Sequence, residues 1–238
     1  MQSLQNRCAI VTGGLGALGR EVCRHFLNEG ARVAVPARPG TSGRELPAGL
    51  KDAGSALFIG EADLEKEDQV RSFVAKAVGQ MGSVDILVAL AGGFAGGGPI
   101  GTLPAATLQE MLSRNLMTTF HACSAVLPLM RAKKSGRIIT IAAKPALIPT
   151  ANRAAYAIAK RAVVTLTETI AEEVKGTGIT ANAIAPSIIV TPANVESMPD
   201  AKTDGWVTPA EIAGLILALC AEDAGSVNGN TIRVFGAV

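Results

Sequence analysis

A glycine-rich loop between an apolar strand and a helix is the feature of this sequence that most restricts its fold. The apolar run Cys8–Thr12 leads directly into the glycine-rich segment Gly13–Gly19, and a helical pattern of apolar residues then continues to a stop at Gly30. A second apolar strand is expected at Ala31–Val35. This β–loop–α–β order predicts a helix whose exposed first amides and positive dipole end can bind a pyrophosphate.

Strands and helices continue to alternate along the rest of the chain. The further strands are expected at Ser55–Gly60, Val84–Leu90, Arg137–Ile141, Ile179–Ile184 and Thr231–Phe235. The further helices are expected at Glu65–Met81, Thr107–Met130 (with a break near Pro128 left open), Asn152–Lys175 and Pro209–Ala221. This alternation predicts a parallel sheet that binds ligands at the carboxyl ends of its strands. We therefore expect the α/β class, with residues 1–238 forming a single doubly wound Rossmann domain.

Composition and charge exclude several classes of partner. Of the 238 residues, 48% are hydrophobic and 18% are charged, which favours a well-filled core. The formal net charge of +2 argues against nucleic acid or an anionic membrane as a partner. The longest apolar runs span about ten residues, too few to cross a bilayer. Four scattered cysteines without a CxxC pair predict buried free thiols in a reducing compartment, so we expect a cytoplasmic protein. Neither His25 nor His121 has a second ligand at metal spacing, so no metal site is expected.

Tyr156 and Lys160 are the strongest candidates for chemistry. They lie four residues apart in an expected helix and so share one face of it. A tyrosine normally titrates near pH 10, and we expect the Lys160 ammonium to lower the pKa of Tyr156 by favouring its phenolate. Tyr156 is the only tyrosine of the chain and follows a nucleotide-binding pattern. Together these facts favour a proton donor over a residue that merely packs.

Several motifs, in order and over the whole length, resemble the short-chain dehydrogenase/reductase family. They are TGGLGALG at Thr12, ADL at Ala62, VDILVALAGG at Val84, RNL at Arg114, YxxxK at Tyr156 and NAIAPSIIVTP at Asn182. The resemblance implies a seven-stranded Rossmann sheet flanked by helices and one nicotinamide cofactor. It also implies an NAD(P)-dependent oxidoreductase that acts on a small molecule.

The resemblance further implies roles for individual residues. Tyr156 would be the acid, Lys160 would bind the nicotinamide ribose, and Asn115 would be a third catalytic residue. The expected cofactor-binding residues are Gly13, Leu15, Gly16, Ala17, Leu18 and Gly19 at the pyrophosphate, Asp63 and Leu64 at the adenine, Ala91 and Gly92 at the adenosine ribose, Ile189 and Thr191 at the carboxamide, and also Gly93 and Pro186.

The sequence departs from the family pattern at four places. Ala17 stands where the glycine spacing has its middle glycine, Ala89 and Leu90 replace two asparagines, and Ser187 replaces a glycine. The fourth departure is Ala143, thirteen residues before Tyr156, where the family has a serine. That hydroxyl usually donates to the developing oxyanion of the substrate, and losing such a donor costs about 10²–10³-fold in rate. Either the protein is a weak catalyst, or its substrate has no carbonyl oxygen to stabilise.

Local stretches resemble dihydropteridine reductases, which are members of the same family that lack this serine. They are GGLGALG, AGGFAGG, IAAKPAL and TPANVESMPDAKTDGWVTP. A quinonoid dihydropterin takes hydride into a conjugated ring, so no isolated alkoxide forms. We therefore expect reduction of a quinonoid dihydropterin-like or other conjugated-ring substrate. The alternatives are a generic ketone or 3-oxoacyl reductase of the same family and a weakly catalytic nucleotide-binding relative.

Four more residues are expected to contact the cofactor or the substrate, and two helices are expected to form an assembly surface. Arg38 follows the second strand, and position 37, where many NAD-preferring relatives have an acidic residue, holds Ala37. A planar cation there suits a 2′-phosphate and favours NADP(H) over NAD(H). Phe94, Trp206 and Ala143 are expected at the substrate, the two aromatic residues as a flat apolar wall. The resemblance also implies that the helices expected over 107–130 and 152–175 form a dimer face, and the second of them is rich in alanine, which allows helices to approach closely. We therefore expect a homodimer or homotetramer.

Overall fold

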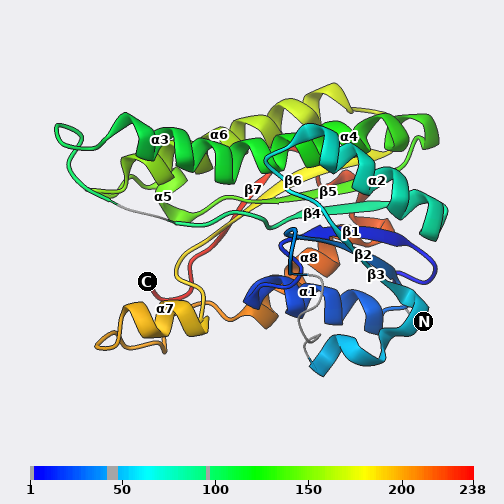
Figure 1. The fold of residues 1–238 in the computed structure, drawn as a ribbon, viewed down its shortest axis with the longest axis horizontal. Coiled ribbons are helices and arrows are strands. Elements are labelled where there is room, and N and C mark those ends of the chain that lie inside the picture. Colours follow the sequence, from blue (N-terminus) through cyan, green and yellow to red (C-terminus); the bar gives the residue numbers. More distant parts are fainter. Residues whose placement is uncertain (1–2, 42–47, 95–96) are drawn as a thin grey trace.

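Seven parallel strands form one sheet in the computed structural model, which describes residues 3–41, 48–94 and 97–238. The order across the sheet is β3-β2-β1-β4-β5-β6-β7 (Figure 1). The strands are β1 (Cys8–Thr12), β2 (Arg32–Ala37), β3 (Leu57–Glu61), β4 (Ile86–Ala89), β5 (Gly136–Ile141), β6 (Ile179–Pro186) and β7 (Thr231–Val234). The predicted α/β class and Rossmann-like sheet are confirmed.

Helices cover both faces of this sheet (Figure 1). One face carries α2 (Glu67–Met81), α4 (Thr118–Lys133) and α6 (Ala154–Glu173), and the other carries α1 (Ala17–Asn28) and α8 (Pro209–Cys220). Three short helices, α3 (Ala105–Met111), α5 (Lys144–Leu147) and α7 (Pro192–Ser197), lie toward the end of the sheet where the chain leaves β4, β5 and β6. The 3₁₀ segments are η1 (Ala48–Ala56) and η3 (Glu222–Ser226). The sequence did not predict α5.

The core forms two layers because alternate strand residues point to opposite faces of the sheet. In β1, Cys8 and Ile10 pack in the cluster beneath α2 and α4, whereas Ala9 and Val11 pack in the cluster beneath α1 and α8. Every residue of β1 is buried, as expected for a parallel strand covered on both faces. All four cysteines are free and buried, which confirms their predicted state.

The long helical segment expected over 107–130 is present, and the break near Pro128 that the sequence left open does not occur, but an unexpected π-helical turn interrupts the α-helical hydrogen bonding. The segment divides into α3, a π-helical turn η2 (Leu112–Met117) and α4, and Pro128 lies inside α4 without ending it. Side chains satisfy main-chain carbonyls directly before and within this turn: Asn115 Nδ2 donates to Met111 O, and Thr119 Oγ1 donates to Asn115 O. Such side-chain hydrogen bonds compete with the main-chain hydrogen bonds of the helix. The periodicity of apolar residues does not reveal this competition.

The strand order places a crevice at the carboxyl ends of the two neighbouring strands β1 and β4. From β1, the strands β2 and β3 follow in one direction across the sheet, and β4 then lies on the other side of β1. The loops after β1 and β4 therefore diverge at their carboxyl ends, and ligands of open α/β sheets bind at such a point.

Candidate active site

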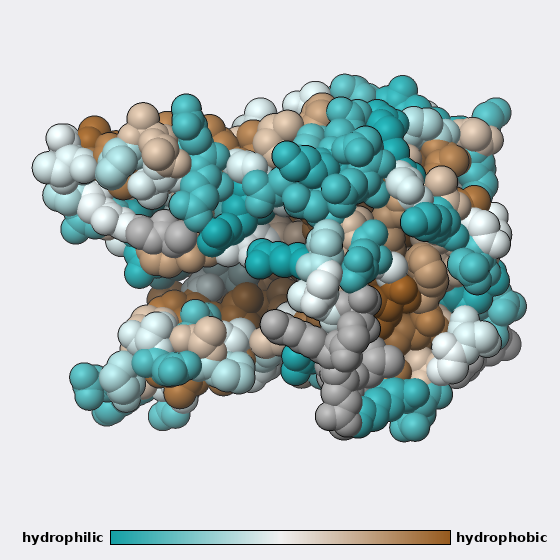
Figure 2. Space-filling view, in the orientation of Figure 1, coloured by the Kyte–Doolittle hydropathy of each residue, from teal (hydrophilic) through white to brown (hydrophobic). Residues whose placement is uncertain are grey.

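A cleft of about 1290 Å³ opens at the carboxyl ends of the strands. Figure 2 shows a hollow with apolar residues in its depth, between the body of the protein and the lobe that contains α7. The cleft brings together nearly all the predicted cofactor-binding residues, namely Gly13, Leu15, Gly16, Ala17, Leu18, Gly19, Arg38, Asp63, Leu64, Ala91, Gly92, Gly93, Tyr156, Lys160, Ile189 and Thr191. Pro186 is not among the residues that line it.

The glycine-rich loop forms one wall of the cleft, and its conformation leaves no room for a side chain at Gly13 or Gly19. Gly13 has a φ of 68°, and a Cβ there would lie 3.1 Å from the Ala91 amide nitrogen. A Cβ on Gly19 would lie 2.1 Å from the carbonyl oxygen of Gly13. Helix α1 begins at Ala17 with no side-chain cap, so its first amides remain for a ligand. Ala17 is exposed at this wall, so the departure from the family's glycine spacing leaves the cleft open.

A second wall of the cleft follows β2 and β3. Arg38 is exposed there, and among the described residues no carboxylate lies within ion-pair distance of its guanidinium. Asp63 is tied into the neighbouring turn, because its amide donates to Gln69 Oε1 and its Oδ1 accepts from the Glu65 amide. The Arg38 cation therefore lies at the wall with no ion-pair partner among the described residues, and Asp63 holds the shape of the loop.

Asn115 supports the glycine loop that follows β4. Its Oδ1 accepts from the Gly93 amide at 3.1 Å, and its Nδ2 donates to the Gly93 carbonyl at 2.9 Å. A Cβ on Gly92 would lie 2.5 Å from Asn115 Oδ1 and 3.3 Å from Lys160 Nζ. The π-helical turn thus directs this fully buried amide into the wall of the cleft, where it holds the loop against Lys160.

Lys160 is nearly fully buried and donates from Nζ to the Ile141 carbonyl at 2.8 Å. Burial lowers the pKa of Lys160 to about 8, because desolvation disfavours its charged form. Its Nζ lies 6.0 Å from the centre of the Tyr156 ring, one helical turn away. The lysine is therefore at the expected place, held by β5 and not by Tyr156.

The expectation that Lys160 lowers the pKa of Tyr156 is wrong for this structure. Tyr156 is half-buried in the cleft wall, and burial raises its pKa to about 12. The opposing effect comes from the positive charge of Arg153, which lowers this pKa by a smaller amount. Desolvation outweighs the charges here, so Tyr156 stays protonated over the physiological range and can donate a proton.

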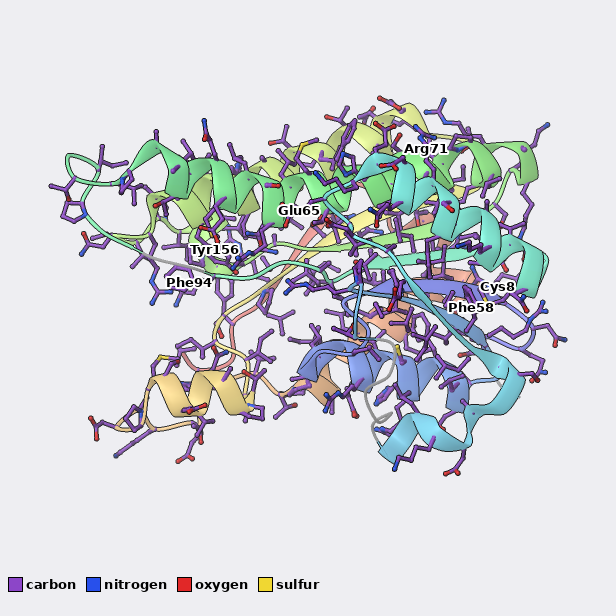
Figure 3. The ribbon with its side chains drawn as sticks, viewed as in Figure 1. Cys8, Phe58, Glu65, Arg71, Phe94 and Tyr156 are labelled. Atoms are coloured by element: carbon purple, nitrogen blue, oxygen red, sulfur yellow. The ribbon has the colours of Figure 1, made fainter. Side chains whose placement is uncertain are left out.

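The three expected substrate residues differ in their placement. Phe94 meets Tyr156 edge to face, with ring centres 5.4 Å apart and an interplanar angle of 88° (Figure 3). Ala143 is buried at the start of α5, two residues beyond Ile141, and its methyl side chain offers no hydrogen-bond donor. Trp206 is 6% exposed. None of these three residues is among those that line the cleft.

Sequence reasoning missed several polar residues that face the cleft or shape it, among them Thr12, Arg20 and Arg114. Thr12, at the end of β1, accepts from the Ala91 amide through Oγ1 at 3.1 Å and so joins the two glycine loops. Arg20 and Arg114 also line the cleft; Arg20 Nε donates to the Leu15 carbonyl, and Arg114 pairs with Glu110. Their positions directly after a strand or beside a motif residue were the signals available in the sequence.

The described part of the chain contains no helix that is both long and apolar enough to cross a membrane. Both histidines have local partners: His25 Nε2 contacts Glu21 Oε1, and His121 Nδ1 contacts the Leu64 carbonyl.

Comparison with known proteins extends over almost the whole chain. A family model described as short chain dehydrogenase matches residues 7–202. A 2-(R)-hydroxypropyl-CoM dehydrogenase of Xanthobacter autotrophicus is 31% identical, with 98% of both chains covered. A D-beta-hydroxybutyrate dehydrogenase of Cupriavidus necator is 30% identical, with 95% of both chains covered.

Solved structures show the same fold. A short chain dehydrogenase/reductase family protein superposes with a TM-score of 0.85 at 30% identity, covering 98% of this chain and 97% of the other. The protein ElxO, solved with NADP bound, superposes with a TM-score of 0.91 at 24% identity and with 97% of both chains covered.

Proposed function

The chain belongs to the short chain dehydrogenase family and is an NAD(P)-dependent oxidoreductase, and we propose that it reduces its substrate with Tyr156 as the proton donor. The observation that carries this proposal is the placement of Tyr156 and Lys160 in the same cleft as the glycine-rich loop. Tyr156 is protonated at neutral pH, and Lys160 is anchored to β5 one turn away. A general acid needs this combination of a retained proton and access to the substrate.

The cleft fits a nicotinamide dinucleotide. The glycine cradle leaves space that a Cβ at Gly13 or Gly19 would remove, and the uncapped start of α1 suits a pyrophosphate. When bound, such a cofactor supplies the hydride. Lys160 would orient the ribose beside Tyr156, Asn115 would hold the loop that borders it, and Ile189 and Thr191 would bind the carboxamide.

We infer a preference for NADP(H) from Arg38. Its exposed guanidinium has no carboxylate partner among the described residues, and Ala37 offers no acceptor for a ribose hydroxyl. A planar, two-pronged cation matches a 2′-phosphate in shape and charge.

For the substrate, Ala143 supports a conjugated ring system such as a quinonoid dihydropterin. A ring that spreads the incoming charge has little need of the donor that position 143 lacks, and the Phe94 ring beside Tyr156 offers an apolar contact for a flat molecule. The second candidate is an oxo compound reduced to a secondary alcohol. It is supported by the names of relatives that match over nearly their whole length, including the two dehydrogenases described above and a 3-oxoacyl-acyl-carrier-protein reductase of Staphylococcus epidermidis that is 29% identical.

We also propose that residues 1–238 act as one cytoplasmic domain that assembles as a homodimer or homotetramer through α4 and α6. Met117, directly before α4, is 37% exposed, and Phe120 and Leu129 within α4 are 44% and 38% exposed. Ile158 on α6 is 47% exposed. A second copy would bury such a group of large apolar side chains. The four buried free thiols suit a reducing compartment.

A panel of NADPH and NADH oxidation assays tests the proposal. The substrates are a quinonoid dihydropterin, simple quinones and simple ketones, each with the wild-type protein and Tyr156→Phe. We expect turnover of at least one class and its loss in Tyr156→Phe, with cofactor binding retained. Unchanged turnover in Tyr156→Phe would exclude Tyr156 as the proton donor.

A further inference from the structure

Arg153 lies immediately before α6 and is linked to Tyr156 through Phe94. Its guanidinium carbon lies 5.0 Å from the centre of the Phe94 ring, and that ring meets Tyr156 edge to face. Figure 3 shows Phe94 and Tyr156 next to each other, where the loop after β4 passes the start of α6. The cation is therefore held one aromatic ring away from the proposed proton donor.

Arg153 has no counter-charge within the described residues. Several other arginines pair with a glutamate, including Arg24, Arg71, Arg114 and Arg131. No carboxylate of the described chain lies within ion-pair distance of Arg153, although its side chain is exposed. The absence of a partner leaves its hydrogen-bond donors available to a ligand.

Two further features make this place favourable for an anion. Helix α6 has 20 residues and no side-chain cap at its N-terminus, so its positive dipole end adds to the charge of Arg153. Phe94 is 49% exposed, and the guanidinium of Arg153 lies over its ring, a cation–π contact that helps to hold the position of the cation. The positive charge also acts at Tyr156, where it lowers the pKa against the effect of burial.

We propose that Arg153 and Phe94 form a subsite for an anionic group, a carboxylate or a sulfonate, which the substrate carries at a distance from its reacting carbon. The proposal rests on the proposed function, because it names the class of molecule that Tyr156 would protonate. It applies equally to an oxo acid and to a conjugated ring with an acidic substituent, because the subsite binds the anion and not the reacting group.

The chemistry of the side chain determines this ligand class. A guanidinium can donate two parallel hydrogen bonds to a carboxylate or sulfonate, and the contact with Phe94 helps to hold it in place for this role. An anion bound at Arg153 would lie beside Phe94, whose ring contacts Tyr156, so a short chain or a ring must separate the anion from the reacting atom. Arg153 is then a specificity-determining residue.

Matched pairs of substrates test the subsite. The pairs are acetoacetate with its methyl ester, 4-oxopentane-1-sulfonate with 2-hexanone, and a naphthoquinone with and without a sulfonate group. For the charged member of a pair that is turned over, we expect Arg153→Gln to raise KM by about 5- to 50-fold, the range of a charge-assisted contact discounted for exposure. The neutral member should change by less than about twofold. Arg153→Lys should restore part of the loss, because it keeps the charge without the planar fork.

Arg161→Gln is the matched control. Arg161 is an exposed arginine of the same helix, two turns further along, so its loss removes the same charge from α6 without touching Phe94. We expect no change of KM for either member of a pair. Equal increases for Arg153→Gln and Arg161→Gln would show a general effect of charge and would overturn the subsite.

A binding measurement separates the subsite from the proposed reaction. Titration calorimetry with butyrate and butyramide, in the presence of NADP⁺, requires no turnover. Butyrate should bind the wild type at least about fivefold more tightly than Arg153→Gln, and butyramide should bind both alike. Loss of turnover in Tyr156→Phe tests the reductase by itself. If Arg153→Gln bound butyrate as the wild type does, the subsite would be refuted even for an active reductase.

Discussion

Replacing Lys160 with methionine should make the protein more stable while removing its activity. The ammonium of Lys160 is 4% exposed, and burial lowers its pKa from 10.5 to about 8. Methionine keeps most of the unbranched aliphatic volume and has no charge to desolvate. We expect the variant to fold and to lose turnover, because it lacks the cation that would orient the ribose beside Tyr156.

The size of the stability change on Lys160→Met follows from the shift in the pKa of Lys160. Between the ordinary and the folded pKa of Lys160, the unfolded chain binds the proton and the folded chain does not, so stability rises with pH in this window. Below about pH 8 both states are charged, and the full cost of burial, about 3 kcal/mol, acts on the folded state. Loss of the hydrogen bond to the Ile141 carbonyl offsets about 1–2 kcal/mol. The net gain for Lys160→Met at pH 7 is therefore about 1–2 kcal/mol.

Urea unfolding followed by the fluorescence of Trp206, the only tryptophan, measures this difference. The experiment compares wild type and Lys160→Met at one protein concentration and at pH 7, 8, 9 and 10. The advantage of Lys160→Met should fall by about 2–3 kcal/mol over this range as the wild-type lysine loses its proton, so that the wild type becomes the more stable protein by pH 10. Exposed Arg161→Met should show a small gap that does not vary with pH. A gap for Lys160→Met that stays constant with pH would refute the argument from desolvation.

Three further substitutions test other parts of the site and its surroundings. Arg38→Asp should weaken NADPH binding by about 1.5–3 kcal/mol and leave NADH binding unchanged or improved, and equal losses in titrations of both cofactors would contradict the 2′-phosphate assignment. Ala143→Ser should leave turnover of a conjugated-ring substrate flat or lower; a gain of about 10²–10³-fold with ketones and no activity with quinonoid dihydropterin would favour the oxo-compound candidate. Phe120→Asp should shift the assembly toward monomer in light scattering, because Phe120 is exposed on α4, and an unchanged mass would count against the proposed interface.

Much of the candidate site could be predicted because its determinants are local. The glycine spacing directly after an apolar strand indicated the loop that holds Gly13 and Gly19, and the four-residue spacing of Tyr156 and Lys160 indicated a shared helical face. The structure places all four at one cleft. These features depend on neighbours within a few residues, which a single sequence displays.

Other properties could not be read from local pattern. In the π-helical turn, the Asn115 side chain donates hydrogen bonds to the carbonyls of Met111 and of Gly93, and Gly93 is distant in the sequence. The sequence alone determined the fold class, the loop and the Tyr156–Lys160 pair, because apolar periodicity and short spacings encode them. Only the tertiary structure decided the pKa of Tyr156 and the contact of Arg153 with Phe94, because burial and through-space distance exist only once distant segments pack together.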